Sequence, residues 1–281
     1  MASMKPVPAP FQLPFTKMAG TGNDFILFDN RAGFFTGQEK DFFNAICKRR
    51  FSIGADGVVL VETGTSAPVR MRYYNSDGQE AAMCGNAARC TALYALDKGI
   101  VSGTAFALEA SDGVHAVSID GREVTVQMIR IADFRTGFSI LREPEFREGG
   151  FINTGVPHFV IFVPDVEKVD ARETAPRYRF HPVFPEGANV NFVQLLDSGS
   201  IRVRTYERGV EDETLSCGTG CVASALMASG NPGYASPVVV ETRGGRLTVA
   251  FDPDWKNVFL SGPVEIVYEG VLMQCLRVHD S

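Results

Sequence analysis

Two cysteines of this chain stand in nearly the same sequence surroundings. Cys84 begins a Cys-Gly-Asn step and Cys217 begins a Cys-Gly-Thr step, and an alanine-rich segment follows each. At the start of a helix, unpaired backbone N–H groups and the positive end of the helix dipole favour an anion, so a thiol there is expected to ionise more readily. Two such thiols that face one pocket would provide a base and an acid.

The spacing of the two cysteines recurs along the chain. Further pairs of short segments match in the same order at an offset of 132 or 133 residues. Repeats are recognised from sustained self-similarity of this kind, so the matches indicate a duplicated domain. The matched pairs are residues 22–25 with 155–158, residues 54–57 with 187–190, residues 70–75 with 202–207, and Glu80 with Glu213.

Length and composition limit the kinds of protein that the chain can be. Its 281 residues have room for about two domains, and 45% hydrophobic with 21% charged residues is ordinary for a globular protein. A net charge of −6 without an extended Lys/Arg cluster argues against a nucleic-acid partner. We find no apolar run of about 18 residues and no export signal. We therefore expect a cytoplasmic protein with free thiols and no membrane partner.

Each half of the chain is predicted to consist mostly of strands around one long helix. Alternating apolar residues predict the strands, and two of three predicted helices follow the paired cysteines. Residues 131–136 are the expected crossing between the halves. The predicted strands are 114–119, 123–128, 246–251 and 257–260, and the predicted helices are about 38–50, 85–98 and 219–229.

Glycine after each paired cysteine suits a first helical turn whose backbone approaches a ligand closely. Asn86 and Thr219 then add polar side chains beside the free N–H donors, which makes each helix start suitable for a carboxylate or phosphate. The alternative is plain capping of two core helices, which requires neither the cysteines nor the glycines. We therefore expect a ligand at both helix starts.

Three longer motifs in the chain resemble those of the diaminopimelate epimerase family. The resemblance extends from about residue 15 to residue 262. The motifs are Lys17-Met18-x-Gly20-x-Gly22-Asn23-Asp24-Phe25; Asn75-x-Asp77-Gly78-x-Glu80-x-x-x-Cys84-Gly85-Asn86-x-x-Arg89-Cys90; and Tyr206-Glu207-Arg208-Gly209 followed by Glu213-Thr214-x-x-Cys217-Gly218-Thr219-Gly220.

The resemblance implies an α/β (α+β) fold of two pseudo-symmetric domains, each a β-rich, barrel-like sheet around a central helix, with the active site in the cleft between them. Residues 12–131 would form the half that carries Cys84, joined by the C-terminal segment 263–281. Residues 132–262 would form the half that carries Cys217. The implied reaction inverts one α-carbon of LL-diaminopimelate to give the meso form, for lysine and peptidoglycan biosynthesis. It implies a small amino-acid partner and neither cofactor nor metal, and a homodimer is left open.

The implied chemistry can be rebuilt from the residues. An α-amino acid C–H is a weak acid, and the sequence shows no pyridoxal lysine motif or metal cluster to accept the electrons. Hydrogen bonds aimed at the carboxylate as it becomes enediolate-like must then provide the stabilisation. One thiolate and one thiol, Cys84 and Cys217, suffice for inversion. A thiol pKa of about 8.5 needs to fall by about two units. A helix terminus contributes only about 0.3–2 kcal/mol, which is less than this shift requires. The family positions of His158 and Glu207 make these residues the expected source of the rest.

By resemblance, nine residues contact the substrate. Arg208 would form a bidentate pair with the distal carboxylate, and Glu207 and the asparagine side chains would hold the ammonium groups. The nine residues are Asn23, Asn75, Gly85, Asn86, Asn189, Glu207, Arg208, Gly218 and Thr219.

Simpler roles stay open for some of these residues. Asn23 is also typical of a turn, Glu207 and Arg208 would also suit a surface ion pair, and His158 would also suit a core or loop position. The other cysteines are expected to be small buried residues without a catalytic role. They are Cys47, Cys90, Cys221 and Cys275.

Two positions depart from the family pattern. Val156 stands where the family often has asparagine before the Pro-His step, and Gly57 stands where it often has glutamine. Both positions face the distal end of the substrate in the family. The departures therefore concern which amino acid is bound more than whether its α-carbon is inverted.

Two other functions agree with part of the pattern. A two-cysteine racemase of proline, hydroxyproline or histidine would use the same thiols, but a one-ended substrate would leave Glu207 and Arg208 unpaired in the cleft. A metal- or redox-binding protein would use cysteines with a histidine, but the Cys-x2-Cys spacing common to zinc sites is missing. The residues of this second alternative are Cys84, Cys90, Cys217, Cys221 and His158.

Overall fold

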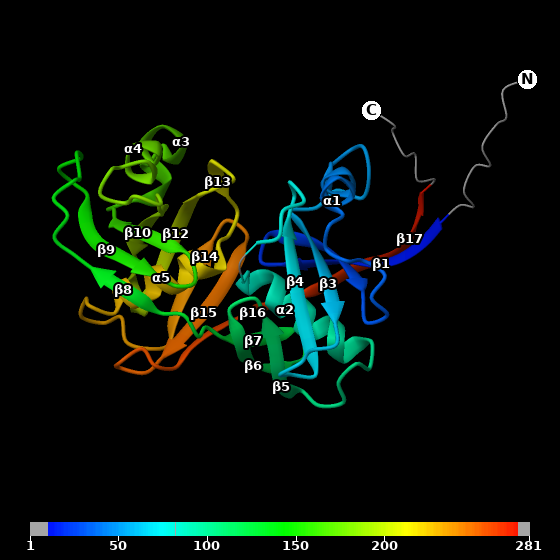
Figure 1. Cartoon of the computed structure of the whole chain (residues 1–281). Helices are drawn as coiled ribbons and strands as arrows, with labels where there is room; N and C mark the ends of the chain where they lie inside the picture. The colour runs from blue at the N-terminus through cyan, green and yellow to red at the C-terminus, as the bar shows by residue number, and fades with distance from the viewer. Residues whose placement is uncertain (1–10, 82, 275–281) are drawn as a thin grey trace, which may run out of the picture.

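The computed structural model describes residues 11–81 and 83–274. Strands dominate the fold, and they form two lobes with one helix in the interior of each (Figure 1). In the N-terminal lobe this helix is α2 (Gly85–Asp97), and in the C-terminal lobe it is α5 (Gly218–Ala228). The predicted fold class, two β-rich α/β halves around central helices, is confirmed.

The two lobes repeat one order of strand pairing. Each begins with an antiparallel hairpin, and the next pairings are parallel, antiparallel, parallel, antiparallel and antiparallel. The duplication seen in the sequence is therefore present in the backbone. The N-terminal lobe contains β1 (Phe11–Gly20), β2 (Asn23–Asp29), β3 (Gly57–Glu62), β4 (Val69–Asn75), β5 (Ala105–Ala110), β6 (Gly113–Asp120) and β7 (Glu123–Gln127); the C-terminal lobe contains β9 (Arg147–Asn153), β10 (Pro157–Phe162), β11 (Asn189–Leu195), β12 (Ser200–Glu207), β13 (Asp212–Thr214), β14 (Val238–Thr242), β15 (Gly245–Phe251) and β16 (Val258–Pro263).

Strand register corrects one detail of the repeat. Phe25 lies opposite Gly57 in the parallel pair of the N-terminal lobe, and His158 lies opposite Asn189 in that of the C-terminal lobe. Since Phe25 and His158 are equivalent, Asn189 is equivalent to Gly57, whereas a constant offset of 133 residues matched it to Asp56. The sequence match followed the loop glycines, and the strand after them begins one residue earlier in the C-terminal lobe.

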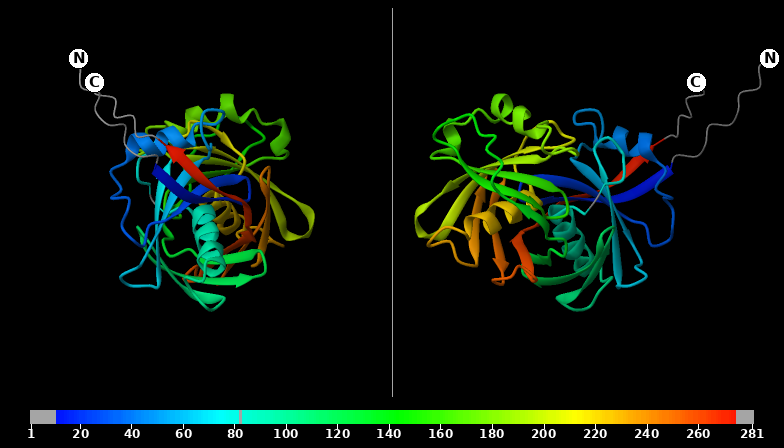
Figure 2. Two further views of the ribbon diagram at one scale, coloured as in Figure 1. Left: turned by 90° about the vertical axis from the view of Figure 1, so that its right-hand side faces the viewer. Right: turned by 60° about the vertical axis from the view of Figure 1, so that its left-hand side comes forward.

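Two strands cross between the lobes and join the sheets. β8 (Ala132–Arg135) follows β7 and pairs with β9, and β17 (Glu265–Gln274) follows β16 and pairs with β1. The sheets also meet directly where β7 pairs with β16. The last strand of the chain therefore lies beside the first, along the N-terminal lobe (Figures 1 and 2). β8 lies where the crossing was expected, and the predicted limits of the two domains stay a prediction.

The two central helices are surrounded by strands. α2 packs against β1 to β7, and α5 packs against β9 to β12, β14 and β15; the left view of Figure 2 shows α2 inside its ring of strands. Every residue of α5 is buried, as expected for a helix without a polar face. Close packing on all sides explains why alanine is so frequent in both helices, because larger side chains would need more space.

The remaining helices are short. α1 is shorter than its predicted span of 38–50, and four single turns were not predicted because one turn carries no detectable periodicity. The strands predicted from alternation correspond to β6, β7, β15 and β16. In the described ranges, no helix has the length and apolar character needed to cross a membrane. The short elements are α1 (Lys40–Cys47), η1 (Val166–Lys168), α3 (Ala171–Thr174), α4 (Pro176–Arg179) and η2 (Asp197–Gly199).

His115 on β6 is buried between two hydrogen-bond acceptors. Its Nδ1 lies 2.8 Å from the carbonyl oxygen of Gln127, and its Nε2 lies 2.9 Å from Oδ1 of Asp112. A carbonyl and a carboxylate can only accept, so this arrangement favours the imidazole with protons on both ring nitrogens. Burial lowers the pKa of His115, but the Asp112 carboxylate and the Gln127 carbonyl outweigh burial, and the pKa is raised.

We predict that this histidine makes the stability of the fold pH-dependent. A group whose folded pKa exceeds its unfolded value stabilises the fold fully below the unfolded pKa, about 6.5 for histidine, and loses this contribution as pH rises through the folded pKa. Wild-type protein should therefore lose more stability than His115→Gln as the pH rises from below about 6.5. Urea unfolding of both proteins over this range measures the difference. The same pH dependence in both would mean that His115 is neutral in the fold.

Candidate active site

Cys84 and Cys217 occupy equivalent backbone positions at the starts of the central helices. Cys84 precedes α2 with φ −116° and ψ 116°, and Cys217 precedes α5 with φ −119° and ψ 112°. Their carbonyl groups accept the first hydrogen bonds of the helices, from Ala88 at 2.8 Å and Cys221 at 2.9 Å. Both cysteines are therefore N-cap residues, whose side chains are close to the free N–H groups of the first turn.

A repeated ion pair anchors the segment before each cysteine. Two N–H···O bonds join Arg72 on β4 to Glu80 at 3.1 and 2.8 Å, and two join Arg204 on β12 to Glu213 at 2.6 and 2.8 Å. Side chains of the second pair are only 7% and 9% exposed, whereas Glu80 is 42% exposed. A buried bidentate pair fixes geometry more firmly than an exposed one, so Cys217 has the more rigid approach.

The two helix starts meet at the junction of the lobes. α2 contacts α5, and a Cβ atom added to Gly218 would lie 3.1 Å from Oδ1 of Asn86 and 3.1 Å from Cδ2 of Leu260. A Cβ atom added to Gly85 would lie 2.9 Å from the same atom of Leu260. Side chains at these two positions would push the helices apart. The glycines predicted to admit a ligand thus also allow the helix starts to approach each other.

The helix starts act on the thiol pKa values in the expected direction, but the net shift of both cysteines is upward because burial outweighs them. Burial raises the pKa of Cys84 to about 11, although two N–H groups of the first helical turn act in the opposite direction. Burial and the charge of Glu207 raise the pKa of Cys217 well above its usual range, against the effect of the Thr219 hydroxyl. Removing a thiolate from water outweighs the few hydrogen bonds that the helix offers.

Glu207, at the end of β12, acts on both thiols with the opposite sign to the one expected. Its negative charge raises the pKa of Cys84 and of Cys217, and burial raises its own pKa. The carboxylate accepts hydrogen bonds from the Thr214 hydroxyl and from Cys217. Glu207 therefore stabilises the protonated thiols, and its charge is suited to the ammonium group of a substrate.

His158, on β10, is fully buried and neutral, because burial lowers its pKa to about 3. Its Nε2 lies 3.0 Å from Oγ1 of Thr219, and this oxygen lies 3.4 Å from Sγ of Cys217. A neutral imidazole supplies no positive charge, so the expected lowering of a thiol pKa by His158 is wrong as a direct effect. Thr219 carries the contact to the cysteine, and the structure thus brings these three predicted residues together.

Asn23 and Asn86 form one hydrogen-bonded group in the N-terminal lobe. Nδ2 of Asn86 donates to Oδ1 of Asn23, and Nδ2 of Asn23 donates to Oδ2 of Asp56 at 3.1 Å. Oδ1 of Asn86 accepts from the Arg89 guanidinium at 2.6 Å. These contacts fix both asparagine side chains at the start of α2, and Asn23 is more than a turn residue.

Arg89 is the main site residue that sequence analysis missed. Its guanidinium is fully buried, and its hydrogen-bond partners among the described residues are the uncharged Thr21, Asn86 and Pro263. Its positive charge acts on the thiol of Cys84 and lowers the pKa of that group against the effect of burial. The signal was its place one helical turn after Asn86, but only the structure shows a buried cation with no carboxylate partner in the described chain.

The residues expected at the distal end of the substrate differ in which of their hydrogen-bonding groups are already used within the protein. Asn189 is buried; its Nδ2 donates to the carbonyl oxygen of Pro157 at 2.8 Å, and its Oδ1 accepts from the backbone N–H of Arg208 at 2.8 Å. It therefore positions Arg208. The Arg208 guanidinium donates to the carbonyl oxygen of Glu186 at 3.0 Å and, within residues 11–81 and 83–274, has no carboxylate partner. Asn75 ends β4 and is exposed.

Tyr73 fills the space beside Gly57. A Cβ atom at Gly57 would lie 2.5 Å from Cε2 of Tyr73 and 2.5 Å from the carbonyl oxygen of Tyr74. The Tyr73 ring in turn packs edge-on against Phe25, with ring centres 5.8 Å apart. A glutamine at position 57 would therefore displace an aromatic pair. Val156 lies half-buried in the turn between β9 and β10, and the structure gives no reason for its departure from the family pattern.

The other described cysteines are structural. Cys47, Cys90 and Cys221 are buried and free, as predicted, and Cys275 lies outside the described residues. In the described part of the chain, no group of three or more His, Cys, Asp or Glu side chains is arranged to hold a metal ion.

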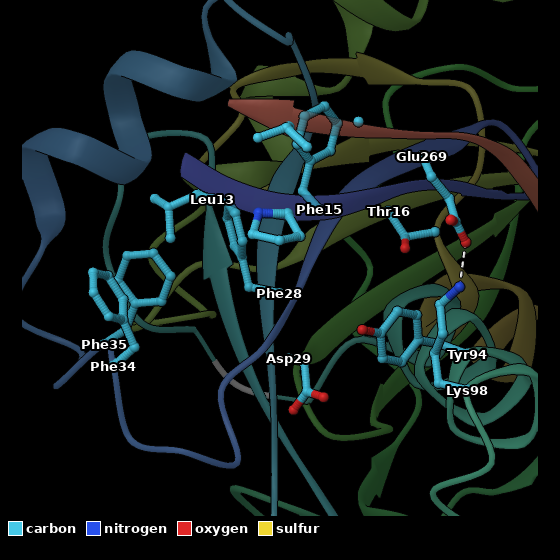
Figure 3. A pocket seen from close by; sticks show the side chains of 13 residues that line it. Leu13, Phe15, Thr16, Phe28, Asp29, Phe34, Phe35, Tyr94, Lys98 and Glu269 are labelled. Carbon is cyan, nitrogen blue, oxygen red and sulfur yellow. Dashed lines mark hydrogen bonds and ion pairs between the residues drawn. The ribbon is translucent and has the colours of Figure 1, made fainter. Parts of the chain in front are cut away.

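A separate hollow of about 450 Å³ opens between β1, β2, β17 and the end of α2 (Figure 3). Its lining is largely apolar, with Phe15, Phe28 and Phe35, and Lys98 pairs with Glu269 at one side. None of the predicted site residues lines it. Acid–base chemistry at an α-carbon needs a pair of proton-transfer groups, and the pair with matched geometry is the one at the helix starts.

Two equivalent lobes that each place a thiol at the start of a central helix define an isomerase of the racemase and epimerase class. The sequence pattern of the diaminopimelate epimerase family matches residues 15–130 and 150–267. The diaminopimelate epimerase from Methanocella arvoryzae is 41% identical to this chain over 276 residues, covering 92% of this chain and 96% of its own. The one from Aquifex aeolicus is also 41% identical, over 277 residues, covering 93% of this chain and 98% of its own. The one from Flavobacterium psychrophilum is 37% identical over 259 residues, covering 90% of this chain and 97% of its own. The chain belongs to the diaminopimelate epimerase family.

Solved structures of more distant proteins share the fold. A PhzF-family phenazine biosynthesis protein from Bacillus anthracis has a TM-score of 0.71 at 14% identity, covering 94% of this chain and 100% of its own. A probable proline racemase from Agrobacterium radiobacter K84 has a TM-score of 0.66 at 16% identity, covering 95% of this chain and 94% of its own. At these identities the likeness concerns the fold alone.

We predict that Cys84 resists alkylation at neutral pH in the protein without substrate. Since burial holds its pKa at about 11, and only the thiolate reacts, its rate of modification by iodoacetamide should still be rising at about pH 9. Mass spectrometry of the peptide that contains Cys84 measures this rate. A plateau below about pH 8 would show that the helix start outweighs burial.

Proposed function

We propose that the protein is a diaminopimelate epimerase that inverts one α-carbon of LL-diaminopimelate to give the meso form without a cofactor, for lysine and peptidoglycan biosynthesis. Membership of the family makes the chain an isomerase. The observation that carries the proposal is the meeting of two helix starts, each capped by a cysteine, at the junction of two equivalent lobes. Opposed proton-transfer groups are what inversion of a carbon centre requires.

In the proposed reaction, one thiolate takes the α-proton, so that an S–H bond forms as the Cα–H bond breaks. The electron pair moves onto the carboxylate, which becomes enediolate-like and accepts hydrogen bonds from the N–H groups of the helix starts. The thiol of the other cysteine then gives its proton to the opposite face of the α-carbon and becomes the thiolate. In the reverse direction, the two cysteines exchange roles.

Substrate binding would favour the ionisation of a thiol, which burial and Glu207 oppose. The α-ammonium group brings positive charge to a site in which Glu207 raises the pKa of both thiols. Once Glu207 is paired with this ammonium, its effect on the thiols is largely cancelled. The buried Arg89 guanidinium adds positive charge beside the start of α2 and holds Asn86 in place. We infer that these charges, and not the helix dipoles alone, form the thiolate.

A second zwitterionic end distinguishes the proposed substrate from those of other two-thiol racemases. Arg208 has donors to spare, and Asn189 fixes its backbone from a buried position. A proline-like substrate would leave this guanidinium without an anionic partner. A screen of amino acids for α-deuterium incorporation in D2O tests the choice, and turnover of proline alone would favour the rival function.

We predict that Cys84→Ala and Cys217→Ala each abolish inversion, because each thiol serves one face of the carbon. Each variant should still exchange the α-proton of the one stereoisomer whose hydrogen faces its remaining cysteine, and the two variants should prefer opposite stereoisomers. NMR of the α-hydrogen in D2O measures both properties. Cys90→Ala, which changes a buried cysteine of α2, is the control. Since a positioned acid or base is worth about 100-fold or more, inversion above about a tenth of wild type in either variant would contradict the two-base assignment.

We predict that Arg208→Met weakens use of diaminopimelate without changing the thiols. Loss of a charge-assisted hydrogen-bond pair should lower kcat/KM by about 10- to 100-fold, while alkylation of Cys84 and Cys217 should follow the wild-type pH dependence. Arg202→Met is the matched control, because Arg202 lies on β12, the strand that ends just before Arg208, but pairs with Glu241. If kcat/KM stayed at the wild-type value, the distal carboxylate would have to bind elsewhere.

A further inference from the structure

A chain of five buried side chains ends at the sulfur of Cys217. Thr205 lies 2.9 Å from Asn191, Asn191 lies 3.0 Å from His158, His158 lies 3.0 Å from Thr219, and Thr219 lies 3.4 Å from Cys217, measured between their polar atoms. None of the five residues is more than 8% exposed. The mechanism above uses only Cys217 from this chain, so the role of the other four residues needs a separate explanation.

The directions of the hydrogen bonds in the chain follow from the orientation of the Asn191 amide. Oδ1 of Asn191 can only accept, so the Thr205 hydroxyl donates to it. Nδ2 of Asn191 faces the carbonyl oxygen of Phe159 at 3.5 Å and Nδ1 of His158; turning the amide over would place its oxygen against that carbonyl. The amide therefore donates to Nδ1, and the proton of the neutral imidazole is on Nε2.

The proton on Nε2 of His158 also determines which atom donates in the hydrogen bond between Thr219 and Cys217. With Nε2–H of His158 donating to Oγ1 of Thr219, the only proton of that hydroxyl has to point elsewhere. Among the described residues, Sγ of Cys217 is the remaining polar atom near Oγ1. The hydroxyl thus donates to sulfur, which is the arrangement that stabilises a thiolate.

Among the described residues of the N-terminal lobe, this chain of side chains has no counterpart. By strand register, Thr205 is equivalent to Tyr73, Asn191 to Val59 and His158 to Phe25, while Thr219 and Cys217 correspond to Asn86 and Cys84. The equivalent positions near Cys84 are thus an aromatic pair and a valine, with no hydrogen bonds between their side chains. The duplicated backbone would permit either arrangement, so the polar chain is a feature of the Cys217 side alone.

A glycine makes room for the polar chain. A Cβ atom added to Gly220 would lie 2.5 Å from Oδ1 of Asn191 and 3.2 Å from Oγ1 of Thr205. The equivalent residue in α2 is Ala87, and the position equivalent to Asn191 is the apolar Val59. A side chain at position 220 would therefore collide with the polar chain, and glycine in the first turn of α5 leaves the space that the chain occupies.

We propose that Asn191 and Thr205 are positioning residues that hold His158 in the tautomer protonated on Nε2, so that the Thr219 hydroxyl donates to Sγ of Cys217 and stabilises its thiolate during turnover. The role of this thiolate in catalysis rests on the proposed function. The tautomer and the hydrogen bond to sulfur do not. Other charged or titratable groups that face these residues are Glu207 on β12 and Cys221 on α5 near Cys217, and Arg208 near His158.

The test compares Thr205→Val, which keeps the shape and removes the hydroxyl, with Thr205→Ser, which keeps the hydroxyl and removes the methyl group. In Thr205→Val, kcat should fall by about 10- to 100-fold, the value of one hydrogen bond to a charged group. The pH dependence of Cys217 alkylation should move up by about one unit for a tenfold effect, while that of Cys84 stays unchanged. Thr205→Ser should stay close to wild type in all three measurements.

Two controls separate positioning from general stability. Thr91→Val removes a buried threonine hydroxyl of α2 that donates to Ala87 at 2.8 Å; it should reduce stability without moving the alkylation profile of Cys217. 15N NMR of histidine-labelled protein reports the tautomer directly. Wild-type His158 should show the Nε2–H form, and Thr205→Val should lose it in part or completely.

Three results would overturn the proposal: an Nδ1–H or doubly protonated His158 in the wild type, wild-type kcat and alkylation in Thr205→Val, or equal losses in the valine and serine variants. If the wild type inverted no amino acid, the proposed function would fail. The NMR and alkylation measurements would still decide whether this chain of side chains directs the Thr219 proton to Cys217.

Discussion

The contact of two helix starts over one leucine is the constraint on which the rest of the structure depends. Leu260 lies on β16, the strand that joins the C-terminal sheet to β7 of the N-terminal sheet, and it touches the space beside both Gly85 and Gly218. Proton transfer to opposite faces of one carbon requires two groups held by rigid elements to within a fraction of an ångström. Two central helices surrounded by strands, and fixed where their sheets join, satisfy this requirement better than loops would.

Burial at this junction has two opposite consequences. It makes each thiolate harder to form, because the pKa of both cysteines is raised. It also strengthens the hydrogen bonds and charges that act once the thiolate and the enediolate exist, because the surroundings screen them less. Glu207 adds to the first consequence, since its charge raises the pKa of both thiols.

Sequence analysis predicted the features that depend on local patterns. The repeat, both central helices and the positions of Cys84 and Cys217 at their starts follow from residue types at short range, and the structure agrees. It failed where burial and distant contacts decide the outcome. The direction of the thiol pKa shifts depends on how much protein surrounds each sulfur, and the neutral state of His158 likewise depends on its complete burial. Asn189 has the residue type of a substrate contact, but neighbours that only the fold brings together use both ends of its amide.

A duplicated backbone does not require duplicated chemistry, and the two lobes have diverged where the substrate itself is asymmetric. In the proposed reaction, the α-carbon would present a hydrogen to one thiol or the other, while its ammonium group and side chain would keep fixed directions relative to the lobes. The two sulfur atoms therefore meet different surroundings even though φ and ψ at the two cysteines agree within a few degrees. An aromatic pair, Phe25 and Tyr73, lies on one side, and His158 with its hydrogen-bonded partners lies on the other. Backbone symmetry fixes where the two thiols stand, and side-chain asymmetry adapts each of them to the face that it serves.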